Sequence, residues 1–182
     1  MKYEYIDGMI KSLVSSKEAK KAGIKIKTAL DLGCGDGYFV DSLRENGIEA
    51  YGIDLAPRRK NKYLITGDAQ HLDKHFKNKK FDVITANGFF CIGGQIEALT
   101  LDNKINRKRI EKDFEKFAET AYQNSLRILK GCYEQLNSPG FLICQETELL
   151  DKLIYSKKDA KNAGFGISGF NEHCATLHKV NA

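Results

Sequence analysis

Asp31-Leu32-Gly33-Cys34-Gly35-Asp36-Gly37 is a glycine-rich turn between an apolar run at residues 28–30 and an amphipathic segment that starts at Tyr38. Glycine at every second position removes each Cβ that would keep a ligand away from the backbone, and it permits positive φ angles. A helix that starts directly after the turn points its free N–H groups and the positive end of its dipole back at the turn. This order predicts a site for a nucleotide-like ligand.

The composition is that of an ordinary globular protein. The chain has 182 residues, of which 42% are hydrophobic and 29% charged, and we expect a single domain over residues 1–182. No apolar run approaches the ~20 residues that span a membrane, and the start lacks the apolar region of a secretory signal. The five scattered cysteines indicate reduced thiols in a cytoplasmic protein, with neither a zinc site nor a disulfide framework. The net charge of +5 permits an anionic partner without requiring one.

The order of the predicted elements indicates an α/β fold. Apolar residues at helical spacing predict an N-terminal helix over residues 1–23 that covers the core. Strands are expected at 27–32, 49–54, 63–66, 81–86, 141–144, 165–170 and 174–180, and helices at 38–46, 104–136 and 148–163. This alternation predicts a doubly wound, mostly parallel seven-stranded sheet with helices on both faces and an antiparallel strand from the C-terminal hairpin.

Two connections carry specific expectations. Asn137-Ser138-Pro139-Gly140 is expected to end the long helix before the fifth strand. The connection over residues 55–62 leaves room for little more than one helical turn, so we expect that part of the sheet to be thinly covered.

Polar side chains follow three consecutive predicted strands. Asp54 ends the second strand, about twenty residues past the turn, where a carboxylate can accept both hydroxyls of a ribose. Asp68, followed by Ala69, comes after the third strand, where it can accept from an exocyclic adenine amine. Asn87 ends the fourth. One aspartate alone is most often a cap or turn residue, but this register at the carboxyl edge of a parallel sheet favours a ligand site.

The turn itself indicates which ligand it suits. Tyr38 stands where the dinucleotide pattern G-x-G-x-x-G needs its third glycine, and the phosphate-binding pattern G-x-x-x-x-G-K-[ST] is absent. Residues 31–37 contain no Lys or Arg and have acids at both ends. Such a turn is better suited to a positively charged ligand, such as an amino-acid moiety or a sulfonium, than to a pyrophosphate.

Four stretches together resemble one enzyme superfamily. Ala29-Leu30-Asp31-Leu32-Gly33-Cys34-Gly35-Asp36-Gly37 resembles motif I of the class I, Rossmann-like S-adenosylmethionine-dependent methyltransferases. Gly52-Ile53-Asp54-Leu55 is similar to the acidic second motif and Gly67-Asp68-Ala69 to the adenine-binding motif. Phe81-Asp82-Val83-Ile84 with Asn87 is similar to the fourth-strand motif. The resemblance implies a methyltransferase that uses S-adenosylmethionine and releases S-adenosylhomocysteine, and it identifies no subfamily.

The resemblance also implies contacts with the methionine part of the cofactor. Asp31 and the backbone of Gly33, Cys34 and Gly35 would lie beside that part. Asn87 would lie near the sulfonium and the transferred methyl group.

The nucleoside part of the cofactor would have its own contacts. Asp54 would hold the ribose hydroxyls, and Leu55 would pack against the adenine. Asp68 and the backbone N–H of Ala69 would address the adenine edge.

Methyl transfer from a sulfonium is an in-line displacement, so much of the catalysis can come from positioning the acceptor. A base is needed only when the acceptor must lose a proton first, and the sequence names no catalytic residue. Ala86-Asn87-Gly88-Phe89 departs from the Asn-Pro-Pro-Tyr and Asp-Pro-Pro-Tyr sequences, which argues against methylation of exocyclic amines of adenine or glutamine. The absence of a Pro-Cys pair argues against covalent cytosine methylation.

The acceptor is left open, with a small molecule favoured. The residues expected around it are Phe89, Phe90, Gly93, Gly94, Glu146, Glu172 and His173. His173 is either a general base or a plain turn residue, and the long loop over 87–101 fits a lid over a small molecule.

Two other functions stay open as alternatives. Basic clusters at 58–62, 77–80 and 107–109 would suit an RNA acceptor, although solvated faces of a lysine-rich protein look the same. The other alternative is a partner subunit that binds S-adenosylmethionine without transfer. A dehydrogenase is the weakest candidate because Tyr38 interrupts its pattern. The sequence does not indicate the oligomeric state.

Overall fold

The computed structural model describes residues 26–91, 113–145, 153–170 and 174–179. The described strands are β1 (Thr28–Leu32), β2 (Glu49–Asp54), β3 (Leu64–Thr66), β4 (Phe81–Asn87), β5 (Leu136–Gln145), β6 (Phe165–Phe170) and β7 (Cys174–Lys179). The described helices are α3 (Tyr38–Glu45), the 3-10 helix η1 (Ala69–His71), α4 (Leu72–His75), α7 (Phe114–Gln135) and α8 (Lys157–Asn162).

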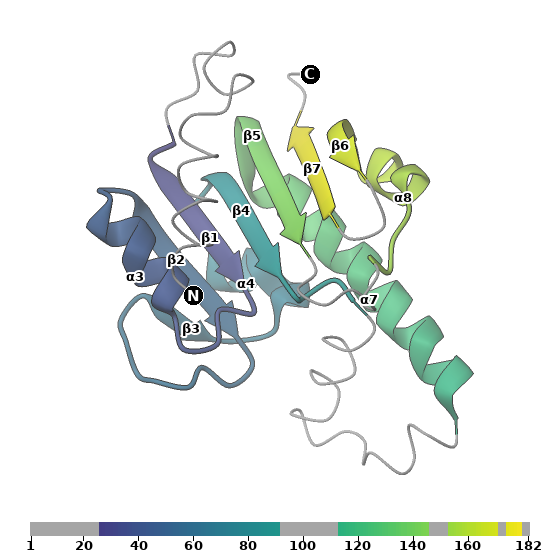
Figure 1. Ribbon diagram of the computed structural model, residues 1–182, viewed down its shortest axis with the longest axis horizontal. Coiled ribbons are helices and arrows are strands. Elements are labelled where there is room, and N and C mark those ends of the chain that lie inside the picture. The colour runs from purple at the N-terminus through teal and green to yellow at the C-terminus, as the bar shows by residue number, and fades with distance from the viewer. Residues whose placement is uncertain (1–25, 92–112, 146–152, 171–173, 180–182) are drawn as a thin grey trace.

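All seven described strands form one sheet in the order β3-β2-β1-β4-β5-β7-β6 (Figure 1). β1 pairs in parallel with β2 and β4, and β5 continues the parallel sheet. β7 runs antiparallel between β5 and β6. The doubly wound, mostly parallel sheet with an antiparallel strand from the C-terminal hairpin is therefore confirmed, and its switch point lies between β1 and β4.

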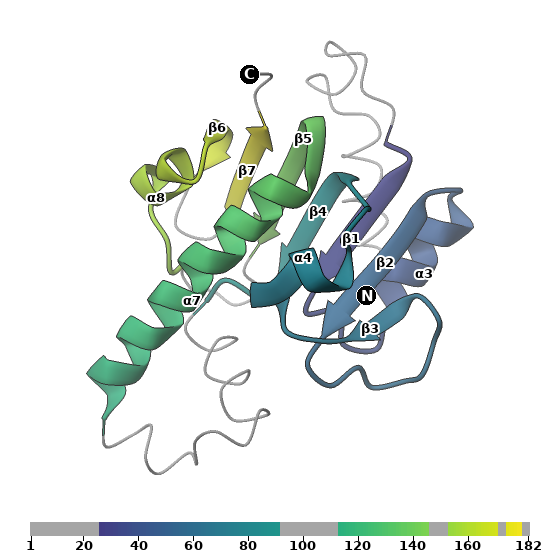
Figure 2. The same cartoon turned by 180° about the vertical axis from the view of Figure 1, so that it is seen from behind.

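Helices cover both faces of the sheet. α3 lies on one face, against β1 and β2, and α4 and α7 lie on the other, as the two opposite views show (Figures 1 and 2). α3 follows Gly37, buries Val40 and Leu43 against the sheet, and ends before Gly47, which has a φ of 79°. This matches the predicted helix, and the positive φ explains the glycine at its end.

β4 is a central and largely buried strand of the parallel part. Phe81, Val83 and Ile84 are fully buried, as a continuous apolar run in a central parallel strand predicts. On the α4 side, the ring of Phe81 packs edge-on against Phe76, with centroids 5.2 Å apart. These contacts explain how a four-residue helix such as α4 stays attached to the sheet.

The start of β5 differs from the prediction. The sequence predicts that residues 137–140 end a helix and that the next strand covers 141–144. Instead β5 begins directly after α7, with Leu136 paired to Phe81 of β4. The register with β4 then shifts before it resumes. Pro139 therefore lies in an irregular part of the strand, where a residue without an N–H is tolerated.

The helix predicted over 148–163 is also shorter than expected in its described part. Leu153 forms an isolated bridge with Cys91, so the chain is extended there. α8 starts only after Ser156, which forms a capping box with Asp159. A local capping signal therefore ends the extended contact with residues 90 and 91 and starts the helix.

Several other expectations have definite outcomes. No helix forms between β2 and β3, as the short connection predicts, whereas η1 and α4 between β3 and β4 were not predicted. The helix over 1–23 and the start of the helix over 104–136 lie outside the described residues. Among the described helices, none has the length and apolar character needed to cross a membrane.

Asp82 joins the amino ends of three strands. Its Oδ2 accepts from the N–H groups of Lys27 and Thr28 at 2.7 and 2.9 Å, and its Oδ1 accepts from Nδ2 of Asn137 at 2.7 Å. Burial raises the pKa of Asp82, but hydrogen bonds from these three residues outweigh it and leave the pKa below its usual value.

Asp82→Asn is expected to lower the free energy of unfolding by about 1–3 kcal/mol near neutral pH, because one amide oxygen cannot replace two carboxylate oxygens. Since the folded-state pKa is lowered, this stabilisation is present above the unfolded-state pKa and is lost as the pH falls through the folded-state value. Urea unfolding measures the difference, with Asp73→Asn on the exposed side of α4 as the control. Equal unfolding midpoints for Asp82→Asn and the unmodified protein would contradict the role of Asp82.

Candidate functional site

Strand register brings the predicted site residues to one edge of the sheet. Leu32, the last residue of β1, lies opposite Ile53 and Ala86, each one residue before the end of its own strand. Asp54 at the end of β2 lies opposite Thr66 at the end of β3. Because the strands are parallel, their carboxyl ends form a common edge, where folds of this kind bind ligands.

Asp54 fastens the glycine turn to the end of β2. Its Oδ2 accepts from the N–H of Gly35 at 2.9 Å, and its Oδ1 accepts from the N–H of Ala56 at 2.9 Å. The carbonyl of Gly35 in turn accepts from the N–H of Arg58 at 2.9 Å. The turn and the β2–β3 connection are therefore one hydrogen-bonded unit, with the carboxylate at its centre.

The three glycines of the turn have different surroundings. All have positive φ angles: 67° at Gly33, 54° at Gly35 and 75° at Gly37. A Cβ on Gly37 would lie 2.5 Å from Cδ1 of Leu64, and one on Gly33 would lie 2.8 Å from the ring of Phe89. A Cβ on Gly35 would meet no described atom within 4 Å. Gly35 is thus the position at which a ligand can approach the backbone.

Asp31 is a buried carboxyl group on the inner side of this turn. It is 6% exposed, and its Oδ1 accepts from the hydroxyl of Thr85 at 2.8 Å. Burial raises the pKa of Asp31 to about 7, the hydrogen bond from Thr85 opposes this, and the negative charge of Asp54 adds to it. A cationic group placed here would favour the charged form, so the geometry fits a positively charged ligand.

Cys34 is a structural residue of the turn. Its side chain is buried against Gly52, where an added Cβ would lie 2.5 Å from Cβ of Cys34. Burial first, and then the charges of Asp31 and Asp54, raise the pKa of its thiol to about 12. The thiol therefore stays protonated and does not act as a nucleophile at neutral pH.

Asp68 lies next along the same edge, at the start of η1. Its Oδ1 accepts from the N–H of Gln70 at 2.8 Å and its Oδ2 from the Gln70 amide at 3.2 Å. Each oxygen keeps a second lone pair for a further donor. Ala69 is buried and Leu55 is half-buried. The structure thus gives Asp68 a capping role that leaves it able to accept from a ligand.

The other side of the edge, at the end of β4, is described only in part. Asn87 is exposed and lies opposite Gln145 of β5. Phe89 is half-buried and packs against Gly33, whereas Phe90 is fully buried, with its ring centroid 5.2 Å from that of Tyr155.

The expectation that Phe90 lines an acceptor pocket is wrong, because its ring belongs to the core. The remaining residues expected around the acceptor lie outside the described residues: Gly93, Gly94, Glu146, Glu172 and His173.

Thr85 is the site residue that the sequence analysis missed. It is a single hydroxyl in the otherwise apolar run of β4, and it lies opposite Asp31 in the register. A lone polar residue in a buried strand is a signal, because a buried hydroxyl needs a partner.

A sheet of this order, with a glycine turn after β1 and acids at the ends of β2 and β3, defines the class I methyltransferase fold. Residues 7–94, which carry the turn and both acids, match a protein-family model described as a methyltransferase domain. The fold is therefore that of the class I S-adenosylmethionine-dependent methyltransferases, and the match of residues 7–94 supports a methyltransferase domain that uses S-adenosylmethionine.

Solved structures share the fold at low sequence identity. An S-adenosylmethionine-dependent methyltransferase from Clostridium acetobutylicum is 12% identical over 100% of both chains, with a TM-score of 0.57. The sugar N-methyltransferase KedS8 from Streptoalloteichus is 11% identical over 93% of this chain and 86% of its own, with a TM-score of 0.57. The antibiotic-resistance methyltransferase Kmr is 16% identical over 91% of both chains, with a TM-score of 0.55. No curated protein sequence matches the chain significantly.

Asp31→Asn is expected to raise the free energy of unfolding of the ligand-free protein by about 1–3 kcal/mol at about pH 8. The folded-state pKa of Asp31 is raised to about 7, so stability falls as the pH rises from the unfolded-state pKa through that value. The gain from the substitution should disappear at about pH 4, where the carboxyl group is largely neutral in the folded state. Urea unfolding at both pH values tests this, with Asp36→Asn in the same turn as the control. An equal gain at both pH values would contradict the assignment.

Gly37→Ala is expected to destabilise the fold by about 1–3 kcal/mol, because its φ of 75° and the contact with Leu64 both oppose a Cβ. Gly35→Ala meets open space and should destabilise less while it weakens cofactor binding more. Thermal unfolding combined with calorimetric titration of S-adenosylmethionine separates the two effects. If Gly37→Ala and Gly35→Ala showed the same ratio of stability loss to affinity loss, the assignment of Gly37 to packing and of Gly35 to ligand contact would be contradicted.

Proposed function

We propose that the protein transfers the methyl group of S-adenosylmethionine to a small-molecule acceptor beside the carboxyl ends of β4 and β5. The observation that supports this most directly is the hydrogen bond from the Gly35 N–H to Asp54. It holds a glycine turn that is open to a ligand and a carboxylate suited to a ribose in one rigid arrangement.

Asp54 is proposed to bind the ribose. Each of its carboxylate oxygens accepts one backbone N–H and keeps a lone pair for one ribose hydroxyl. Leu55, next along the chain, is proposed to pack on the adenine, and Asp68 with the N–H of Ala69 to contact its edge.

Asp31 is proposed to lie near the cationic methionine part, together with the backbone of Gly33, Cys34 and Gly35. A nearby cation favours the carboxylate form and so opposes the burial that raises its pKa. Binding of the cofactor should then release protons near neutral pH.

The cofactor supplies a methyl group on a sulfonium and leaves as S-adenosylhomocysteine. The contribution of the chain is to position the acceptor in line with that methyl group, so catalysis is mainly positional. Asn87, exposed at the end of β4, is proposed to lie beside the methyl group, and Phe89, which packs on Gly33, to form an apolar wall between the turn and the acceptor.

A small-molecule acceptor is supported by the fold shared with a sugar N-methyltransferase. A second candidate is RNA, which is favoured by the basic β2–β3 connection. We also propose that the whole chain is one domain and that it is cytoplasmic. The second point is supported by five free cysteines, of which four are buried.

Asp54→Ala is expected to weaken S-adenosylmethionine binding by about 1–3 kcal/mol, or about 5- to 150-fold in Kd, because the ribose loses its hydrogen-bond acceptors. Asp54→Asn keeps one acceptor oxygen and should lie between Asp54→Ala and the unmodified protein. Calorimetric titration measures both, with NAD as the control ligand and thermal unfolding as the check that each variant is folded. Unchanged affinity in a folded Asp54→Ala protein would remove the assignment.

Acceptor class is tested with methyl-labelled S-adenosylmethionine on separate small-molecule and RNA fractions of a cell extract. We expect label in the small-molecule fraction, and label only in RNA would establish the second candidate. Tight cofactor binding without transfer to either fraction would instead indicate a non-catalytic partner subunit.

A further inference from the structure

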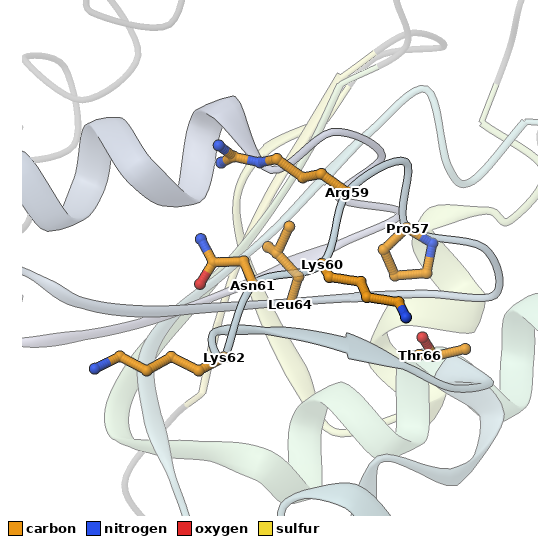
Figure 3. A pocket seen from close by; sticks show the side chains of 7 residues that line it. All are labelled: Pro57, Arg59, Lys60, Asn61, Lys62, Leu64 and Thr66. Atoms are coloured by element: carbon orange, nitrogen blue, oxygen red, sulfur yellow. The ribbon is translucent and has the colours of Figure 1, made fainter.

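A cavity of about 440 Å³ lies between the β2–β3 connection and β3, on the side of the glycine turn away from β4. Its lining consists of Pro57, Arg59, Lys60, Asn61, Lys62, Leu64 and Thr66. Figure 3 shows Lys60 directed toward the side of Pro57 and Thr66, while Arg59 runs toward a neighbouring helix. All of these residues belong to the described part of the chain, and none was predicted to contact the cofactor.

The cavity is strongly cationic. Residues 57–67 include four basic residues and no acid. Arg59 forms an ion pair with Asp41 of α3, which fixes its direction, and its Nε is buried without a hydrogen-bond partner among the described atoms. No described carboxylate lies within ion-pair distance of Lys60 or Lys62. Apart from Arg59, the connection therefore concentrates positive charge that the described part of the fold does not neutralise.

The polar groups of the lining are mostly donors. Oδ1 of Asn61 accepts from the N–H of Tyr63 at 3.1 Å, so its NH₂ group is left to donate. The hydroxyl of Thr66 can donate as well, and the lysine and arginine heads only donate. A ligand that fits this set offers several acceptor oxygens and negative charge, which is the chemistry of a phosphate group.

Tyrosine rings hold further cations along the same edge of the sheet. The guanidinium of Arg44 lies 3.3 Å from the ring centroid of Tyr63, and Nζ of Lys62 lies 4.8 Å from it. Nζ of Lys79 lies 4.0 Å from the ring centroid of Tyr51, on the neighbouring strand, but it pairs with Glu49 and so adds no unneutralised charge. Cations repeated along an edge suit a chain of phosphates better than a single phosphate.

The cavity is separate from the acceptor side of the site. β3 and β4 are three strand spacings apart in the sheet order, about 14 Å, so a small acceptor at β4 does not reach it. Only an extended ligand spans both places. A ligand confined to this cavity is therefore separate from a small acceptor at β4, and the cavity does not depend on which acceptor is methylated.

We propose that this basic cavity binds a phosphate group of an anionic ligand, and that the charge pattern along the edge favours a single-stranded nucleic acid over a free phosphorylated metabolite as its source. The cavity would take one phosphate, and Arg44 and Lys62 on the ring of Tyr63 would continue the contact along the strand.

The test is fluorescence anisotropy of the full chain, without cofactor, with a labelled single-stranded RNA of about 12 nucleotides. The double variant Lys60→Ala/Lys62→Ala should bind about 10-fold more weakly, with a salt dependence smaller by about one to two ions. The matched control is Lys157→Ala/Lys158→Ala on α8, which removes the same charge beside β6 at the opposite edge of the sheet and should bind normally.

Inorganic phosphate and AMP are titrated calorimetrically into the same proteins. If Lys60→Ala/Lys62→Ala weakens AMP binding and RNA binds no more tightly than AMP, the nucleic-acid proposal is wrong and the cavity binds the phosphate of a metabolite. Equal weakening in the cavity variant and the control overturns the proposal, as does an absence of binding by all three probes. Displacement of the probe by saturating S-adenosylmethionine also overturns it, because the cavity would then belong to the cofactor site. Thermal unfolding confirms that both variants are folded.

Discussion

The carboxylate of Asp54 is the interaction on which the site depends. Through two hydrogen bonds of 2.9 Å it holds the backbone N–H groups of Gly35, in the turn after β1, and Ala56, just after β2. The turn can then keep positive φ angles at its glycines and deliver α3 to one face of the sheet. A carboxylate at this point is thus structural before any ligand arrives, and the same geometry orients its remaining lone pairs outward.

A second constraint is electrostatic. Asp31 lies on the core side of the turn, where the hydroxyl of Thr85 is its side-chain partner among the described residues and the negative charge of Asp54 is nearby. The buried carboxyl group therefore makes the fold less stable than an apolar residue at this position would, which is a common property of sites that are shaped for a charged ligand. The structure compensates elsewhere, through the buried aromatic contacts of β4 and the hydrogen bonds of Asp82.

Much of the fold could be predicted because its strands are local apolar runs with glycine or acid at their ends. The start of β5 could not, since Leu136 joins the strand only by pairing with Phe81, which is distant in sequence. Phe90 could not be assigned either, because nothing local distinguishes a core ring from a pocket ring. The role of Thr85 could not be assigned because its partner Asp31 is 54 residues away in the sequence. The sequence does show that Thr85 is a lone hydroxyl residue in an apolar strand. The cofactor contacts themselves stay predictions that the geometry accommodates.

The placement of β7 has a consequence for how the molecule assembles. β6 pairs only with β7 among the described strands, and β7 also separates it from β5. The half of the sheet that carries the glycine turn, from β1 to β4, can pair as soon as those residues leave the ribosome. β5 can then pair with β4, but β6 has to wait until β7 has been made, because among the described strands β7 is its only neighbour. The edge from β3 to β5, which carries the candidate site, can therefore form before the C-terminal hairpin completes the sheet.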